Sequence, residues 1–180
     1  MKKQFIAKLL ALALVLSMVP ATILAASAAG TNSGYNDGYY DVYEDTTVRV
    51  NEPVPETGVI EAKVVAGTAT VTLNAKAVES LANLAQGGSI ELEIKSEGAT
   101  KVEVYLDAAA LIKVAEETGA DLTIKSSVAT ITIPNAVLTN EFTNTGSVKV
   151  SVQNTGSSVG FSIQASGKAL KNIKGLKVEF

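Results

Sequence analysis

The sequence predicts an α+β fold dominated by β-strands: an antiparallel, sandwich-like domain with two short helices and an extended N-terminal arm. Three observations support this prediction. Short runs of β-branched or alternating apolar residues recur from residue 59 to the end of the chain, as is typical of half-buried strands. Two alanine-rich segments between them have helical spacing. An acidic segment poor in aliphatic residues precedes them, and such a segment has little to bury.

The strand-like runs are short, and turn residues separate them. They lie at 59–65, 69–73, 90–95, 101–106, 121–125, 128–133, 147–153, 159–165 and 175–180. A shorter β-branched run at 46–50 could form one more strand within the arm.

Two helices are predicted, over residues 74–86 and 107–118. Asn74 and Asp107 are good N-terminal caps, and glycines follow each segment. Because helices this short are marginal alone, we expect them to pack on a sheet.

The helical segments belong to a predicted internal repeat. Residues 71–96 parallel residues 104–126: each has a strand, a capping residue, an alanine-rich helix, a glycine turn and a strand. A clipped third copy follows at 129–142, where Pro134 can open one helical turn. Shared composition is the alternative explanation for this similarity.

Residues 1–28 have the features of a secretory signal peptide. Lysines precede an apolar run over residues 9–19, and small residues follow it. We expect cleavage after Ala28, with Ala25 or Ala26 as alternatives. The apolar run is shorter than the roughly 20 residues that span a bilayer, so we expect no stable membrane span after cleavage; a retained anchor is the alternative. The sequence thus predicts a secreted protein, extracellular or associated with the cell wall.

We therefore divide the chain into a signal peptide at 1–28, an acidic, tyrosine-containing flexible arm at 29–58 and a β-rich domain at 59–180.

The composition argues against catalysis and against cofactors. The chain has no cysteine, histidine or tryptophan. It therefore lacks disulfides, thiolate metal ligands and a lipobox cysteine, and it lacks the usual general base near neutral pH. We expect no enzyme, no cofactor and no metal site. An exported chain without disulfides fits a Gram-positive bacterium.

The pattern Gly-x-Ser-x-Gly occurs at residues 156–160, with Ser158 in the position of a nucleophile. Such a serine needs a base, and the chain has no histidine to supply one. The pattern is better explained as a turn between two strands.

Charge is distributed unevenly along the chain. Acids concentrate between residues 29 and 61, where Arg49 is the only cation, and lysines recur at the C-terminal end. A concentrated basic face is absent from this pattern, so we expect no nucleic-acid partner. The acids Asp37, Asp41, Glu44 and Asp45 could bind calcium, but their spacing is not that of an EF-hand loop, and a solvated tail explains them better.

Several residues are candidate assembly contacts. They are Tyr35, Tyr39, Tyr40, Tyr43, Val48, Val50, Lys171, Lys174 and Lys177. The tyrosines could dock on a neighbouring subunit or stack on a glycan; a spacer is the alternative. The lysines could meet an anionic wall polymer or the acidic arm of another copy; the solvated face of an edge strand is the alternative.

The segment VYLDAAALIKVAEETGADLTIKSSVATITIPNAVL (104–138) and the closing FSIQASGKALKNIKGLKVEF (161–180) resemble a known module. It is the β-rich module found upstream of S-layer homology repeats in secreted Firmicutes cell-surface proteins. The resemblance covers roughly 60–180, and no S-layer homology repeat follows in this sequence. It implies a non-catalytic module of the bacterial cell surface, with no catalytic residues to transfer.

Together these features predict a secreted structural protein that self-assembles into an extracellular layer or fibre, by strand addition across chains. The expected partners are other copies or other cell-surface proteins, and cell-wall polysaccharide is a further candidate. A monomeric, non-catalytic module that binds the cell wall or acts as an adaptor is the alternative.

Overall fold

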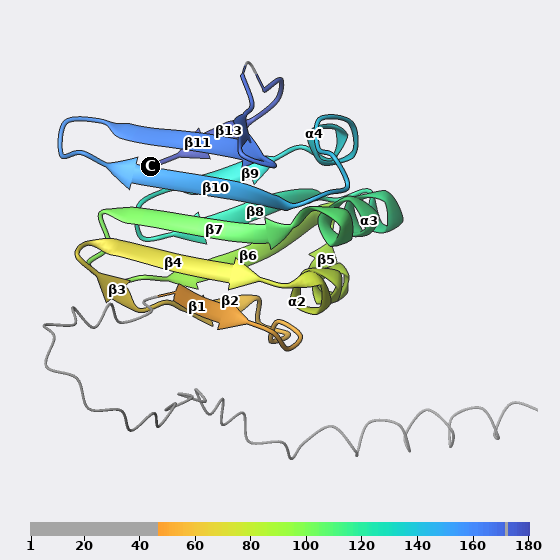
Figure 1. Cartoon of the computed structure of the whole chain (residues 1–180), viewed down its shortest axis with the longest axis horizontal. Helices are drawn as coiled ribbons and strands as arrows, with labels where there is room; N and C mark the ends of the chain where they lie inside the picture. The colour runs from red at the N-terminus through yellow and green to blue at the C-terminus, as the bar shows by residue number, and fades with distance from the viewer. Residues whose placement is uncertain (1–46, 172) are drawn as a thin grey trace, which may run out of the picture. The chain divides into compact units, whose positions relative to one another are not determined.

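The computed structural model describes residues 47–171 and 173–180. It contains two β-sheets that pack face to face and short helices that gather at one end of them (Figure 1). The prediction of a β-dominated sandwich with short helices is confirmed. The predicted signal peptide and the predicted arm up to residue 46 lie outside the described residues.

The first sheet, sheet A, has seven strands. Its order is β1 (Thr47–Val50), β4 (Thr68–Leu73), β7 (Lys101–Asp107), β10 (Ser147–Asn154), β11 (Val159–Ala165) and β12 (Lys168–Ala169), and β3 (Val64–Val65) pairs with β4. The second, sheet B, has six strands. Its order is β2 (Val59–Glu61), β6 (Ser89–Lys95), β8 (Asp121–Ser126), β9 (Thr130–Ile133) and β13 (Lys177–Glu179), and β5 (Ala85–Gln86) pairs with β6.

The two similar sequence segments fold into neighbouring units of the same design. In one, β4 leads through α2 (Ala75–Ser80) and the 3₁₀ helix η1 (Leu81–Leu84) to β6. In the other, β7 leads through α3 (Ala108–Thr118) to β8. Each unit leaves sheet A and enters sheet B, so equivalent strands run parallel. The sheets are therefore mixed, and not antiparallel throughout as the sequence suggested.

The chain also passes from sheet A to sheet B between β1 and β2, but through a loop and not a helix. β1 runs parallel to β4, and β2 runs parallel to β6. Val54, in the connecting loop, is buried, and its backbone N–H donates to the Ser80 hydroxyl at 2.8 Å. Residues 47–58 are thus part of the sandwich, whereas the sequence assigned them to the arm. A run of four β-branched or basic residues forms a strand here because β4 offers it a partner.

The next crossing runs in the opposite direction. β9 leads through α4 (Asn135–Asn140) to β10, from sheet B back to sheet A. β9 is antiparallel to β8, and β10 is antiparallel to β7. α4 is a third helix, which the sequence indicated only as one turn after Pro134.

The predicted caps hold the helix starts. The Asn74 side chain accepts from the Ala77 N–H at 2.9 Å, and the Asp107 side chain accepts from the Ala110 N–H at 3.0 Å. Gly119 ends α3 in the left-handed region, with φ 64°. Such a conformation costs glycine little.

Candidate functional site

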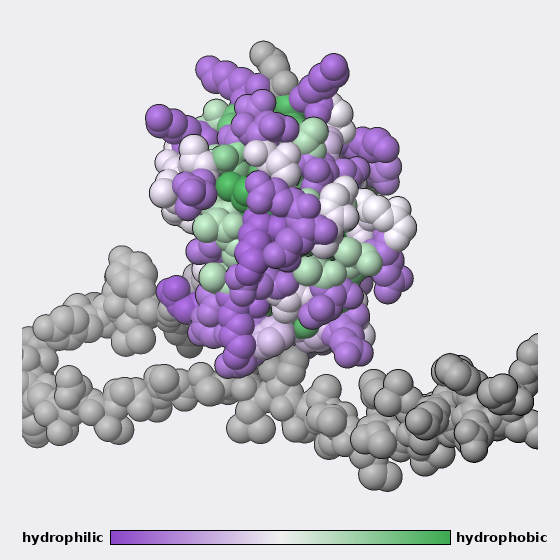
Figure 2. Space-filling model, turned by 90° about the vertical axis from the view of Figure 1, so that its right-hand side faces the viewer, coloured by the Kyte–Doolittle hydropathy of each residue, from purple (hydrophilic) through white to green (hydrophobic). Residues whose placement is uncertain are grey.

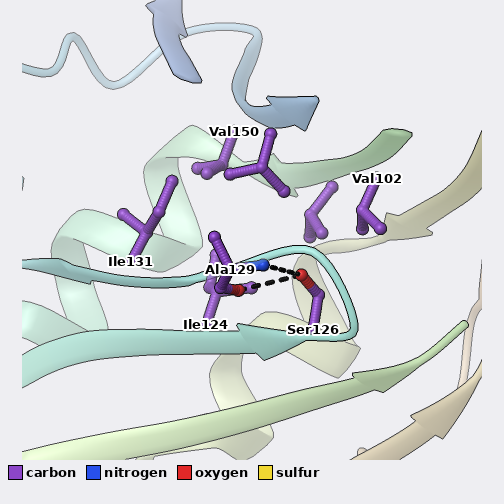
Figure 3. Close-up of a pocket in the computed structure, with 8 residues that line it drawn as sticks. Val102, Ile124, Ser126, Ala129, Ile131 and Val150 are labelled. Atoms are coloured by element: carbon purple, nitrogen blue, oxygen red, sulfur yellow. Dashed lines mark hydrogen bonds between the residues drawn. The ribbon is translucent and has the colours of Figure 1, made fainter. Parts of the chain in front are cut away.

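A small cavity, of about 10 Å³, lies between the sheets in the interior of the sandwich. Figure 3 shows Val102 and Val150 on one side of it and Ile124, Ala129 and Ile131 on the other. The Ser126 hydroxyl, the polar group at its edge, donates to the Ala129 carbonyl at 2.9 Å. A cavity of this size holds at most one water molecule and is too small for a ligand.

The outer face of sheet A is a polar surface. Because side chains alternate along a strand, the residues that face outward follow from the buried ones. The buried residues of β7 are Val102, Glu103, Val104 and Leu106, and the apolar three face the core. On the strands either side of β7, the outward positions carry hydroxyl and amide side chains: Thr68, Thr70, Thr72, Ser151 and Gln153.

A charged cluster lies at the middle of this face, formed by Lys101, Glu103 and Tyr105 of β7 and Lys149 of β10. We call it the sheet A cluster. Both lysines reach the same carboxylate oxygen, Glu103 Oε1: the Lys101 Nζ lies 2.6 Å from it and the Lys149 Nζ lies 3.0 Å from it. The Tyr105 hydroxyl donates to Glu103 Oε2 at 3.2 Å. The Lys149 ammonium also lies 5.1 Å from the centroid of the Tyr105 ring.

Glu103 is the anchor of the cluster. Its side chain is 12% exposed, against 34% for Lys101 and 24% for Lys149. Burial by itself raises the pKa of Glu103, but the hydrogen bonds and the positive charges of the two lysines outweigh it and hold this pKa below its ordinary value. Glu103 is therefore ionised at neutral pH, and the cluster carries one more positive than negative charge.

The outer face of sheet B has the opposite balance. Carboxylates outnumber lysines at its outward positions, which carry Glu61, Glu91, Glu93, Lys95, Asp121, Lys125, Lys177 and Glu179. One ion pair on this face joins Lys125 to Glu91 at 2.5 Å. The two broad faces of the sandwich thus differ in the sign of their charge.

Two of the predicted lysines share a groove at the helix end. A groove of about 260 Å³ lies between α4 and the segment after β12, lined by Ala136, Val137, Asn140, Glu141, Leu170, Lys171, Ile173 and Lys174. Lys171 and Lys174 thus lie together, while Lys177 lies apart from them on the outer face of sheet B.

The other predicted contacts lie elsewhere. Val48 and Val50 are partly buried and pack against the core, so their side chains serve the fold. Tyr35, Tyr39, Tyr40 and Tyr43 lie outside the described residues.

Ser158 lies in a turn between β10 and β11, as the sequence suggested. Its carbonyl oxygen accepts from the Thr155 N–H at 2.9 Å, and the two side-chain hydroxyls lie 3.0 Å apart.

Sequence reasoning missed the sheet A cluster. Lys101, Glu103 and Tyr105 alternate along one predicted strand, and this alternation in the sequence was enough to predict that they share a face. Lys149 lies more than forty positions away in the sequence, and only the pairing of Lys149 with Tyr105 brings it to the cluster.

The helix end is mostly hydrophilic, with small and separate hydrophobic patches (Figure 2). Within residues 47–171 and 173–180, no helix has the length and apolar character needed to cross a membrane. The same part of the chain holds no group of three or more acidic side chains arranged to bind a metal ion. Comparison with protein families, curated proteins and solved structures found no match.

Proposed function

We propose that this chain is a secreted, non-catalytic structural protein of the bacterial cell surface that assembles with other copies into a layer or fibre by strand addition. The features of a signal peptide at residues 1–28 support export. The resemblance of residues 60–180 to the module upstream of S-layer homology repeats supports a surface role. The observation that carries the assembly is the edge of sheet B at β2.

The backbone groups of β2 alternate in direction. Gly58 and Ala62, on either side of the strand, bond to β6: the Gly58 carbonyl accepts from the Glu93 N–H at 2.8 Å, and the Ala62 N–H donates to the Lys95 carbonyl at 2.9 Å. Ile60 lies between them in the same register, opposite Ile94. The N–H and C=O groups of Val59 and Glu61 therefore point away from β6. Such an edge can accept the backbone of another chain.

The opposite end of sheet B has a second edge at β13, which within the described residues pairs with β9 alone. β2 and β13 are different surfaces at opposite ends of one sheet. A contact between β13 of one copy and β2 of the next would repeat without closing, and heterologous contacts of this kind produce filaments.

The test is the state of the purified chain after export. Light scattering and negative-stain electron microscopy on one sample should show ordered fibres or sheets. Deletion of residues 29–46 leaves β1 in place and tests whether the acidic arm contributes to polymer formation. Polymers that dissolve at high salt would implicate charge pairs, whereas salt-resistant polymers would implicate backbone pairing. A stable monomer at high concentration contradicts the proposal.

A monomeric module that binds the cell wall is the second candidate, and the same edge favours it. β2 has three residues, Glu61 ends it, and Pro53 and Pro55 precede it. Short edge strands, charges and prolines are features that resist strand addition. This candidate predicts a protein that stays monomeric and is retained by isolated cell-wall material.

A further inference from the structure

We propose that the sheet A cluster is a binding site for a linear anionic polymer, one whose repeating units carry phosphate or carboxylate groups. This inference goes beyond the proposed assembly and holds whether or not the chain polymerises. It rests on the geometry of Lys101, Glu103 and Lys149 and on the charge of the surface around them.

The two lysines are held ready for an anion. Each ammonium has three N–H donors, and both ammonium groups meet at one oxygen of Glu103. One donor each on that oxygen leaves further donors, and both side chains are partly exposed. Lysine side chains lose much conformational freedom when a ligand fixes them. Here a nearly buried carboxylate has already fixed them, which lowers the cost of binding.

The surroundings suit an extended ligand. Within the described residues, Glu103 is the only acid in the rows of outward side chains that pass through Lys101, Glu103 and Tyr105. The two lysines already balance its negative charge. Neighbouring positions on β10 and β11 carry Ser151, Ser162 and Gln164, whose hydroxyl and amide groups can bond to a polar chain. The acidic outer face of sheet B would repel the same polymer, so binding should select one side of the sandwich.

The aromatic residue favours an anion over a neutral sugar. Neutral sugars bind through stacking on exposed aromatic rings, and Tyr105 is the aromatic side chain of the cluster. The Lys149 ammonium lies over its ring, with 5.1 Å between the nitrogen and the ring centroid. This face of the ring therefore already holds a cation, in the place where a sugar would stack.

The test measures retention of the exported chain on three immobilised polymers: polyphosphate, polygalacturonate and neutral dextran. We expect binding to one or both polyanions, none to dextran, and a steep loss of binding with added salt. Binding to polyphosphate alone identifies a phosphate polymer, and binding to polygalacturonate alone identifies a carboxylate polymer. Failure to bind either polyanion overturns the proposal, whatever the outcome of the assembly experiment.

Variants locate the site. Replacing Lys101, Glu103 and Lys149 together by glutamine removes the cluster and leaves no unpaired charge, and it should weaken binding about tenfold. The control is Lys95→Gln with Lys125→Gln on the opposite face, which should bind as the wild type does. Unchanged binding in the triple variant, or an equal loss in the control, overturns the proposal.

Discussion

At the scale of single residues, Glu103 shows how one nearly buried charge organises a surface. Two lysines and a tyrosine hydroxyl satisfy its carboxylate, which offsets the cost of removing it from water. Because its pKa is lower in the folded chain than its ordinary 4.5, the carboxylate stabilises the fold above that pH. This contribution is lost as the pH falls through the folded-state value.

We therefore expect Glu103→Gln to lower the free energy of unfolding by about 1–2 kcal/mol at pH 7. The difference from the wild type should shrink as the pH falls from 4.5 through the lower folded-state pKa of Glu103, because both side chains are neutral below that pKa. Urea unfolding of both proteins at a series of pH values measures this difference in the free energy of unfolding. A difference that stays constant from pH 7 to pH 3 would show that the loss has another origin.

Gly58 fixes the entry into β2. Its φ is +68°, and a Cβ at this position would lie 2.5 Å from the Glu91 carbonyl oxygen. Gly87 also has a positive φ, +59°, but a Cβ there would meet nothing within 4 Å. Gly87→Ala should thus cost only the backbone strain, about 1 kcal/mol, whereas Gly58→Ala should cost at least about 2 kcal/mol. Equal losses in chemical denaturation would mean that β2 is not held against β6 as described.

At the scale of elements, the cap-to-helix units decide where the chain turns from one sheet to the other. Asn74 and Asp107 occupy equivalent positions in neighbouring units and cap their helices through equivalent bonds. Asn74→Ala and Asp107→Ala should each destabilise the protein by about 1 kcal/mol. Glu116→Ala, at an exposed position of α3, should change stability by less than about 0.5 kcal/mol. Cap variants that melt with the wild type would argue that packing alone sets the helix starts.

The elements were largely predictable from local patterns. Alternation revealed the strands, and the caps and glycines marked the starts of α2 and α3 and the end of α3, because these signals depend on neighbouring residues. The end of α2 was not visible: the predicted helix over 74–86 stops at Ser80 and continues as η1 and β5. Pairing was also not visible. A strand, helix and strand look alike in sequence whether the chain leaves sheet A or sheet B, so the reversed unit around α4 could not be foreseen.

The sites were less predictable than the fold, because they depend on strand pairing, which local patterns do not reveal. Lys171 and Lys174 are close in sequence and lie in one groove, whereas the cluster around Glu103 needs a register between β7 and β10. Val48 and Val50 show the same limit. Their short run carried no sign of a partner, but β4 pairs with it, and both valines pack against the core.

At the scale of the whole molecule, the strand orders of the two sheets correspond along the sandwich, from β1 and β2 at one end to β11 and β13 near the other. Neighbouring units bury each other's apolar faces, as in other repetitive structures, where the terminal units need protection or a partner. The unit formed by β1 and β2 has a loop where the others have a helix. We therefore propose that this end of the sandwich, through β2, meets the β13 edge of another copy.

The most direct test of assembly by strand addition compares two substitutions at Glu61. The Glu61 N–H points away from β6, so Glu61→Pro removes a donor from the outer edge without breaking a bond within sheet B. Glu61→Val keeps that donor and removes the charge. Polymer mass, measured by light scattering on samples with matched thermal stability, should fall to the monomer for Glu61→Pro and rise for Glu61→Val. Polymers of wild-type mass in the folded Glu61→Pro variant would contradict strand addition at β2.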